Sequence, residues 1–185
     1  SIIANAGRNA AIQNIYDLHS ERSVSPNDIS QSLLLTSVYE IPIGRGRLVG
    51  KNWNHFTDFL IGGWQVNGIL TLQTGFPLAL STQNTSNAGG AVLRPNTNGQ
   101  SVALSGSDND RPARYFNTSV FSQPVPFTFG NVGRTIPDVR GPGVHNLDFS
   151  AFKNFHIKER ANVQFRGEFF NFTNTPTFGL PDQVL

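Results

Sequence analysis

The chain of 185 residues contains no cysteine, which excludes disulfide bonds and thiolate metal sites. It contains no methionine and does not begin with one, so we expect it to be a segment of a longer protein. No apolar run approaches the roughly 20 residues of a transmembrane helix, so a membrane role would have to use strands. Charged residues are only 14% of the chain, and the 14 basic ones are scattered. Nucleic-acid binding, which needs a clustered basic surface, is therefore not expected.

Sequence signatures of catalysis are also missing. There is no Gly-x-Ser-x-Gly elbow, phosphate-binding loop or dinucleotide fingerprint. The four histidines are far apart and lack the spacing of metal ligands. The acidic stretch at residues 105–110 lacks the glycine and the distal glutamate of a calcium loop. We expect no enzymatic activity, no cofactor and no metal.

The residues that are abundant favour β-structure with long connections. Hydrophobic residues reach only 38%, while the chain holds 18 Gly, 11 Pro and 15 Phe. Glycine and proline favour turns, and aromatic residues favour strands. Little helix is expected.

Apolar and polar residues alternate with the period of a strand in several segments. The apolar parities are Leu33, Leu35, Tyr39 and Ile41; Trp64, Val66, Gly68, Leu70 and Leu72; Leu147, Phe149, Ala151 and Phe155; and Val163, Phe165 and Phe169. Trp53, Phe56 and Leu60 instead recur at helical spacing. The expected organisation is an unassigned polar segment (1–28), strands with a short helical turn (29–80), a long irregular loop (81–145), a β-hairpin (146–172) and a final loop (173–185).

Strand length favours a membrane barrel over a soluble sandwich. Residues 146–156 and 161–172 match the about 9 to 11 residues with which a tilted barrel strand crosses a bilayer. Sandwich strands more often have roughly 5 to 6 residues. The predicted fold is all-β, with antiparallel strands of a partial transmembrane β-barrel. If the long loop lies outside, the turn at residues 157–160 falls on the periplasmic side. Tyr39, Trp64 and Phe155 lie near strand ends, where interface aromatics are expected.

Charged residues suggest two candidate ligand sites. Arg111, Arg114, Arg134 and Arg140 in the long loop are candidates for an anionic ligand. Asp148, Arg166 and Glu168 fall on the polar parity of the hairpin and are expected to face a barrel lumen. Asp148 and Glu168 would also suit a glycosidase as paired carboxylates, but such an enzyme needs a cleft, so lumen-facing charge is the favoured interpretation.

A series of ordered motifs resembles the C-terminal barrel portion of Oar-like TonB-dependent receptors, a type that contains a carboxypeptidase-regulatory-like domain. The motifs cover most of residues 29–179. They are Tyr39-Glu40-Ile41-Pro42, Gly44-Arg45-Gly46, Gly62-Gly63-Trp64-Gln65, Tyr115-Phe116-Asn117-Thr118, Phe127-Thr128-Phe129-Gly130-Asn131-Val132-Gly133-Arg134, Arg140-Gly141-Pro142-Gly143, Asn146-Leu147-Asp148-Phe149-Ser150, Phe152-Lys153-Asn154-Phe155, Glu159-Arg160 and Gln164-Phe165-Arg166-Gly167-Glu168-Phe169-Phe170-Asn171-Phe172.

The resemblance implies a bacterial outer-membrane location and energised uptake of a bulky nutrient, such as an oligosaccharide, metal chelate or peptide. The implied partners are outer-membrane lipid, the plug and remaining barrel of the receptor, and TonB through a plug region that this chain lacks. Residues 173–185 would precede a missing terminal strand. A partial barrel has open strand edges, which favour self-association. The alternatives are a secreted or surface β-sandwich or adhesin-like module that binds carbohydrate, or a self-assembling β-rich fragment.

Overall fold

The computed structural model describes residues 11–90, 92–106, 114–157 and 161–185. The chain divides into two compact units, one made of Ser1–Gln31, Gln73–Val144 and Thr177–Leu185, the other of Ser32–Leu72 and His145–Pro176. The elements are β1 (Ser32–Glu40), α1 (His55–Ile61), β2 (Trp64–Gln73), β3 (Pro77–Leu78), β4 (Asn96–Thr97), the 3-10 turn η3 (Thr118–Val120), β5 (Phe121–Ser122), β6 (Ile136–Arg140), β7 (Val144–Ile157) and β8 (Ala161–Phe169). Within the described ranges, no helix has the length and apolar character to cross a bilayer.

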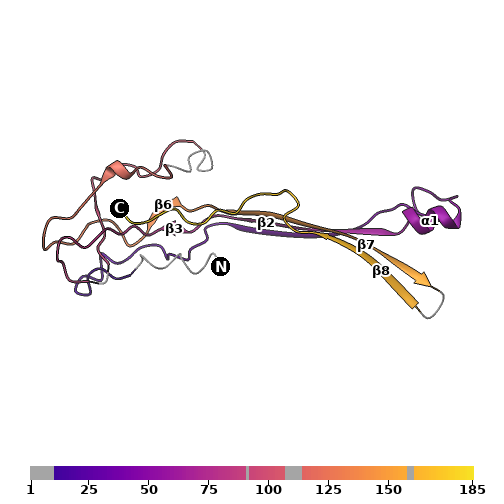
Figure 1. Ribbon diagram of the computed structural model, residues 1–185, viewed down its shortest axis with the longest axis horizontal. Helices are drawn as coiled ribbons and strands as arrows, with labels where there is room; N and C mark the ends of the chain where they lie inside the picture. The colour runs from indigo at the N-terminus through magenta and orange to yellow at the C-terminus, as the bar shows by residue number, and fades with distance from the viewer. Residues whose placement is uncertain (1–10, 91, 107–113, 158–160) are drawn as a thin grey trace. The chain divides into compact units, whose positions relative to one another are not determined.

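The four long strands form one sheet in the order β1-β2-β7-β8. The Ile41 amide donates to the Trp64 carbonyl, and the Thr74 amide donates to the Gln31 carbonyl, so β1 and β2 run antiparallel. β7 and β8 are also antiparallel and lie side by side in Figure 1. Each long strand therefore pairs with the next one along the chain, as in an up-and-down barrel wall. The predicted all-β, antiparallel fold is confirmed, and the sheet is open, with β1 and β8 at its edges.

The register of the hairpin separates an apolar face from a polar face. Phe149 pairs with Phe169, and Ala151 pairs with Gly167, on the apolar parity. On the other parity, Ser150 pairs with Glu168. The apolar side chains are not sealed in a core: they include exposed residues on both edge strands, namely Leu33, Leu35, Tyr39, Val163, Phe165 and Phe169. In a soluble sandwich this face would be buried against a second sheet.

Helix α1 forms in the connection between β1 and β2 because both of its ends are capped. The Asn54 side chain accepts a hydrogen bond of 2.8 Å from the Thr57 amide, which satisfies a donor of the first turn. At the other end, the Gly62 amide donates to the Asp58 carbonyl. A Cβ at Gly62 would lie 2.9 Å from the Asp58 backbone carbonyl oxygen and 2.3 Å from its carboxylate, so a larger residue there would force a shift. The expected short helical turn is thus present at residues 55–61.

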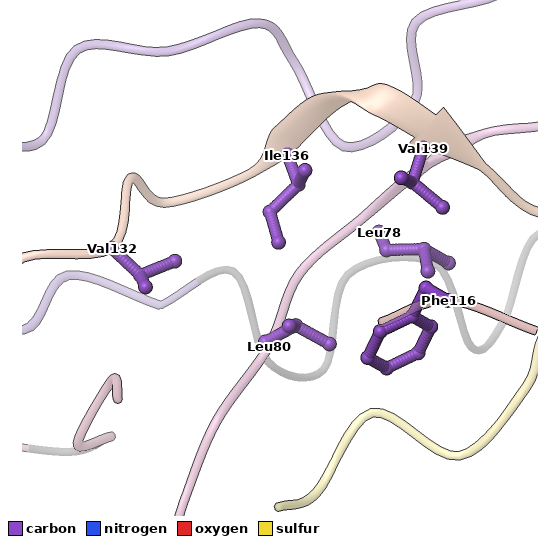
Figure 2. Packing of buried hydrophobic residues seen from close by; sticks show 6 residues of the cluster. All are labelled: Leu78, Leu80, Phe116, Val132, Ile136 and Val139. Atoms are coloured by element: carbon purple, nitrogen blue, oxygen red, sulfur yellow. The ribbon is translucent and has the colours of Figure 1, made fainter. Parts of the chain in front are cut away.

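The unit that contains the long connection has a hydrophobic core of its own. Its buried cluster comprises Leu78, Leu80, Phe116, Val132, Ile136 and Val139, whose side chains point toward one another in Figure 2. The pairs β3·β6 and β4·β5 form two small antiparallel sheets in this unit. The chain from residue 177 joins it as well, because the Ser81 amide donates to the Gln183 carbonyl and the Leu185 amide donates to the Ser81 carbonyl. Packing orders a segment that has almost no sequence periodicity.

The second strand is shorter than the sequence pattern suggests. The alternation continues toward Leu80, but β2 ends at Gln73 and residues 77–78 form β3 in the other unit. Between them, the backbone at Gly75 passes so close to Gly141 that a Cβ there would lie 1.8 Å from the Gly141 carbonyl oxygen. Leu78 and Leu80 are apolar because they fill this unit's core. The expected turn at residues 157–160 lies mostly outside the described residues.

Candidate functional site

Aromatic side chains gather at one end of the sheet. Tyr39 lies near the end of β1, Trp64 begins β2, and Phe155 lies near the end of β7, so antiparallel pairing places all three at the same end. Phe165 of β8 joins them, with its ring 5.9 Å from that of Trp64. Phe59 of α1 also belongs here, since its ring centroid is 4.8 Å from that of Phe155. The predicted interface aromatics thus form part of a larger group.

A buried lysine stands among these aromatics. Lys153 pairs with Phe165 and therefore lies on the apolar parity, although its side chain is charged. It is only 4% exposed. Its Nζ donates to the carbonyls of Asp58, at 3.2 Å, and Gly62. The carbonyls at the end of a helix lack partners within the helix and carry negative partial charge, which favours a cation beside them. Lys153 therefore fastens the end of α1 to the apolar face of the sheet.

Charged residues of the polar parity meet in a hollow with a mixed lining. Asp148, Arg166 and Glu168 line this hollow of about 140 Å³ with Asn67 and Ser150, and its wall also includes the apolar residues Ile69, Phe149, Phe169 and Phe170. Arg166 Nε lies 2.7 Å from a Glu168 carboxylate oxygen, and Asp148 accepts the amide of Asn171 at 2.9 Å. In the part of the chain that the structure describes, Asn67 Oδ1 is buried without a hydrogen-bond partner. The three charged residues predicted to face a lumen are thus brought together on the polar side of the wall.

Three of the four candidate arginines of the long connection lie among the described residues, and they differ in exposure. Arg111 lies outside the described residues. Arg114 is exposed, and Arg134 is half-buried. Arg140 is engaged inside its own unit, where it forms a 2.6 Å ion pair with Asp28. It also donates to the Asp28 and Gly75 carbonyls. Arg140 therefore helps to hold this connection together.

A buried ion pair that the sequence did not indicate supports the same unit. Arg94 donates to Glu21 at 2.8 and 3.2 Å, and the two side chains are 1% and 5% exposed. Gln13 completes the network by accepting from the Arg94 amide at 2.6 Å and donating to the Gly130 carbonyl. Removal from water lowers the pKa of the Arg94 guanidinium, and the Glu21 carboxylate acts against that change. The separation of 73 positions between the partners leaves no local sequence signal.

Among the described residues, no three His, Asp or Glu side chains lie close enough together to hold a metal ion. The acidic stretch at residues 105–110 falls largely outside the described ranges.

A strand pattern with one lipid-type face and one polar face agrees with the comparison against protein families. The family model described as "Outer membrane beta barrel domain" matches residues 2–185, nearly the whole chain. Comparisons with curated proteins and with solved structures give no match. The match places the protein in the bacterial outer membrane, with lipid against its wall. The chain belongs to the outer membrane β-barrel domain family.

Proposed function

We propose that this chain forms part of the wall of an Oar-like TonB-dependent receptor that takes up a bulky nutrient without chemically changing it. One observation carries the proposal: a single sheet has an exposed apolar face and an opposite face on which Asp148, Arg166 and Glu168 meet in a hollow. A wall of this kind separates lipid from a polar interior. Charges of both signs on the inner side suit the passage or docking of a polar solute.

The ordered series of motifs supports the finer assignment to a TonB-dependent receptor. Two of those motifs meet at one end of the wall. Gly62 allows α1 to end against the sheet. Trp64 starts β2 beside the buried lysine of β7. These are requirements of a particular wall geometry, so their joint occurrence in one order is more specific than any single motif.

Uptake in living cells tests the proposal. A strain lacking the gene would be complemented with the full-length gene product and offered three labelled probes: an oligosaccharide, a ferric chelate and a peptide. Accumulation of one probe is expected to need both the gene and TonB, and to stop when a protonophore removes the proton gradient. The paired substitution Arg166→Gln with Glu168→Gln is expected to reduce that accumulation at unchanged protein level. If the cells still accumulate the probe after TonB is removed, energised transport is contradicted.

A further inference from the structure

The connection between β1 and β2 attaches to the lipid-facing side of the wall. Lys153 and Phe155 both lie on the apolar parity of β7. α1 contacts both of them, through hydrogen bonds to the lysine and through the Phe59 ring. The helix therefore sits on the outside of the barrel wall, at the end of the sheet, and not on the polar side.

α1 has no buried residue, and its apolar side chains are available to a further partner. Phe56 is 72% exposed, and Phe59, Leu60 and Ile61 are each more than half exposed. Leu48 and Val49, in the same connection, are also exposed. A short helix with this much exposed apolar area gains free energy by lying in the boundary between headgroups and acyl chains. Phe59 joins this helix to the apolar parity of the sheet, since its ring contacts that of Phe155.

The charge of the connection indicates which lipid it meets. Residues 41–63 contain Arg45, Arg47 and Lys51 but a single acid, Asp58. That acid is engaged, because its carboxylate accepts the Arg45 amide at 2.6 Å. The guanidinium of Arg45 lies 2.7 Å from the His55 ring, and Arg47 has only an exposed 3.4 Å contact with Glu40. Both arginines line a cavity of about 400 Å³ that also borders Phe59 and Trp64. Lys153 adds a third positive charge to its lining, against the carboxylates of Glu40 and Asp58.

This combination of arginines and aromatic rings suits a phosphate headgroup with its glycerol and upper acyl chain. Guanidinium groups pair with phosphate oxygens in a bidentate fashion, and basic residues beside a bilayer attract anionic lipid. The connection joins the end of β1 to the start of β2, whereas the longer connection leaves from the end of β2 and returns to the start of β7, so the two are attached to opposite ends of the strands. With the longer connection outside, as in outer-membrane barrels, this end meets the periplasmic leaflet.

We infer that α1 and the segment carrying Arg45 and Arg47 form a binding site for an anionic phospholipid of the periplasmic leaflet. Lys153 acts as a positioning residue that holds α1 against the wall. The site anchors the rim of the barrel at a fixed depth and does not depend on transport.

Native mass spectrometry of the delipidated full-length gene product tests this inference, with phosphatidylglycerol, phosphatidylethanolamine or lipopolysaccharide added as the probe. The wild type is expected to bind phosphatidylglycerol more tightly than phosphatidylethanolamine. Arg45→Gln and Arg47→Gln are each expected to weaken phosphatidylglycerol binding about fivefold, the effect of one basic side chain at an anionic membrane surface. Arg22→Gln is the control, because it removes the same charge from an exposed position in the other unit.

A second variant separates the apolar contribution from the charge. Phe56→Ser is expected to weaken the binding of both phospholipids by the same factor, since it removes an exposed ring and no charge. Far-ultraviolet circular dichroism verifies that each variant is folded. Equal affinity of the wild type for the two phospholipids would overturn the inference, and so would unchanged binding in both arginine variants. Lipopolysaccharide bound in place of phosphatidylglycerol, and lost with the same arginines, would also overturn it by placing this end in the outer leaflet.

Discussion

Glu21→Gln is expected to lower the local stability of the unit that contains Arg94 by about 3 to 5 kcal/mol. Glu21 is the buried counter-ion of Arg94, with N–O distances of 2.8 and 3.2 Å. The amide would leave the guanidinium charge buried and uncompensated. With its oxygen still accepting the amides of Gln13 and Asn14, the side-chain NH2 group would replace the oxygen that now accepts from Arg94 at 3.2 Å. The loss of stability should extend to the segments that this network joins, near residues 13–21, 94 and 130.

Hydrogen exchange of the full-length gene product measures this loss directly. Peptides that cover residues 92–97 should exchange faster in Glu21→Gln than in the wild type. Glu40→Gln is the matched control, because Glu40 pairs with Arg47 in an exposed position, with side chains 56% and 42% exposed. Pairs of that kind contribute about 0 to 1 kcal/mol. If the two variants had equal effects, the buried pair would not be the support assigned to it.

Ala151→Arg and Ser150→Arg are expected to differ sharply although the residues are neighbours on β7. Ala151 lies on the apolar face, midway along its strand and opposite Gly167. An arginine at the midplane of the lipid-facing side costs about 2 to 4 kcal/mol. Ser150 lies on the polar face, opposite Glu168, where a guanidinium meets an acid and water. Its replacement should change stability by less than about 1 kcal/mol.

Urea unfolding of the two variants in lipid vesicles gives the comparison. The variants introduce the same side chain one position apart, so differences in strand propensity and in net charge cancel. A larger loss for Ser150→Arg than for Ala151→Arg would mean that the faces are assigned the wrong way round.

The strands and α1 could be predicted because their signals are local. In β7 and β8, successive side chains point to opposite faces of the sheet, so apolar and polar residues alternate along the sequence. The spacing of Trp53, Phe56 and Leu60 predicts the helix, and the Asn54 side chain caps its N-terminus. Lys153 is a charged residue on an apolar parity, which is visible in the sequence. The sequence pattern does not show which groups its ammonium contacts.

The packing of the long connection could not be predicted. Leu78, Phe116 and Val132 belong to one core but come from segments without periodicity. Their meeting depends on long-range contacts, as does the pairing of Glu21 with Arg94. Arg140 shows the same limit: its sequence suggests a ligand-binding arginine, while its partners Asp28 and Gly75 are distant in the chain. The local sequence pattern therefore predicts the strands of the wall, whereas the structure of the long connection depends on contacts between residues that are distant in the sequence.

Accessibility of spin labels along β8 tests the central claim most directly. The chain has no cysteine, so a single one can be introduced in turn at Val163, Gln164, Phe165 and Arg166 and labelled with a nitroxide in the full-length, bilayer-embedded protein. Positions 163 and 165 should respond to oxygen, which concentrates in lipid, and positions 164 and 166 to a water-soluble nickel chelate. Uniform accessibility, or the opposite alternation, would contradict a wall whose apolar face meets lipid.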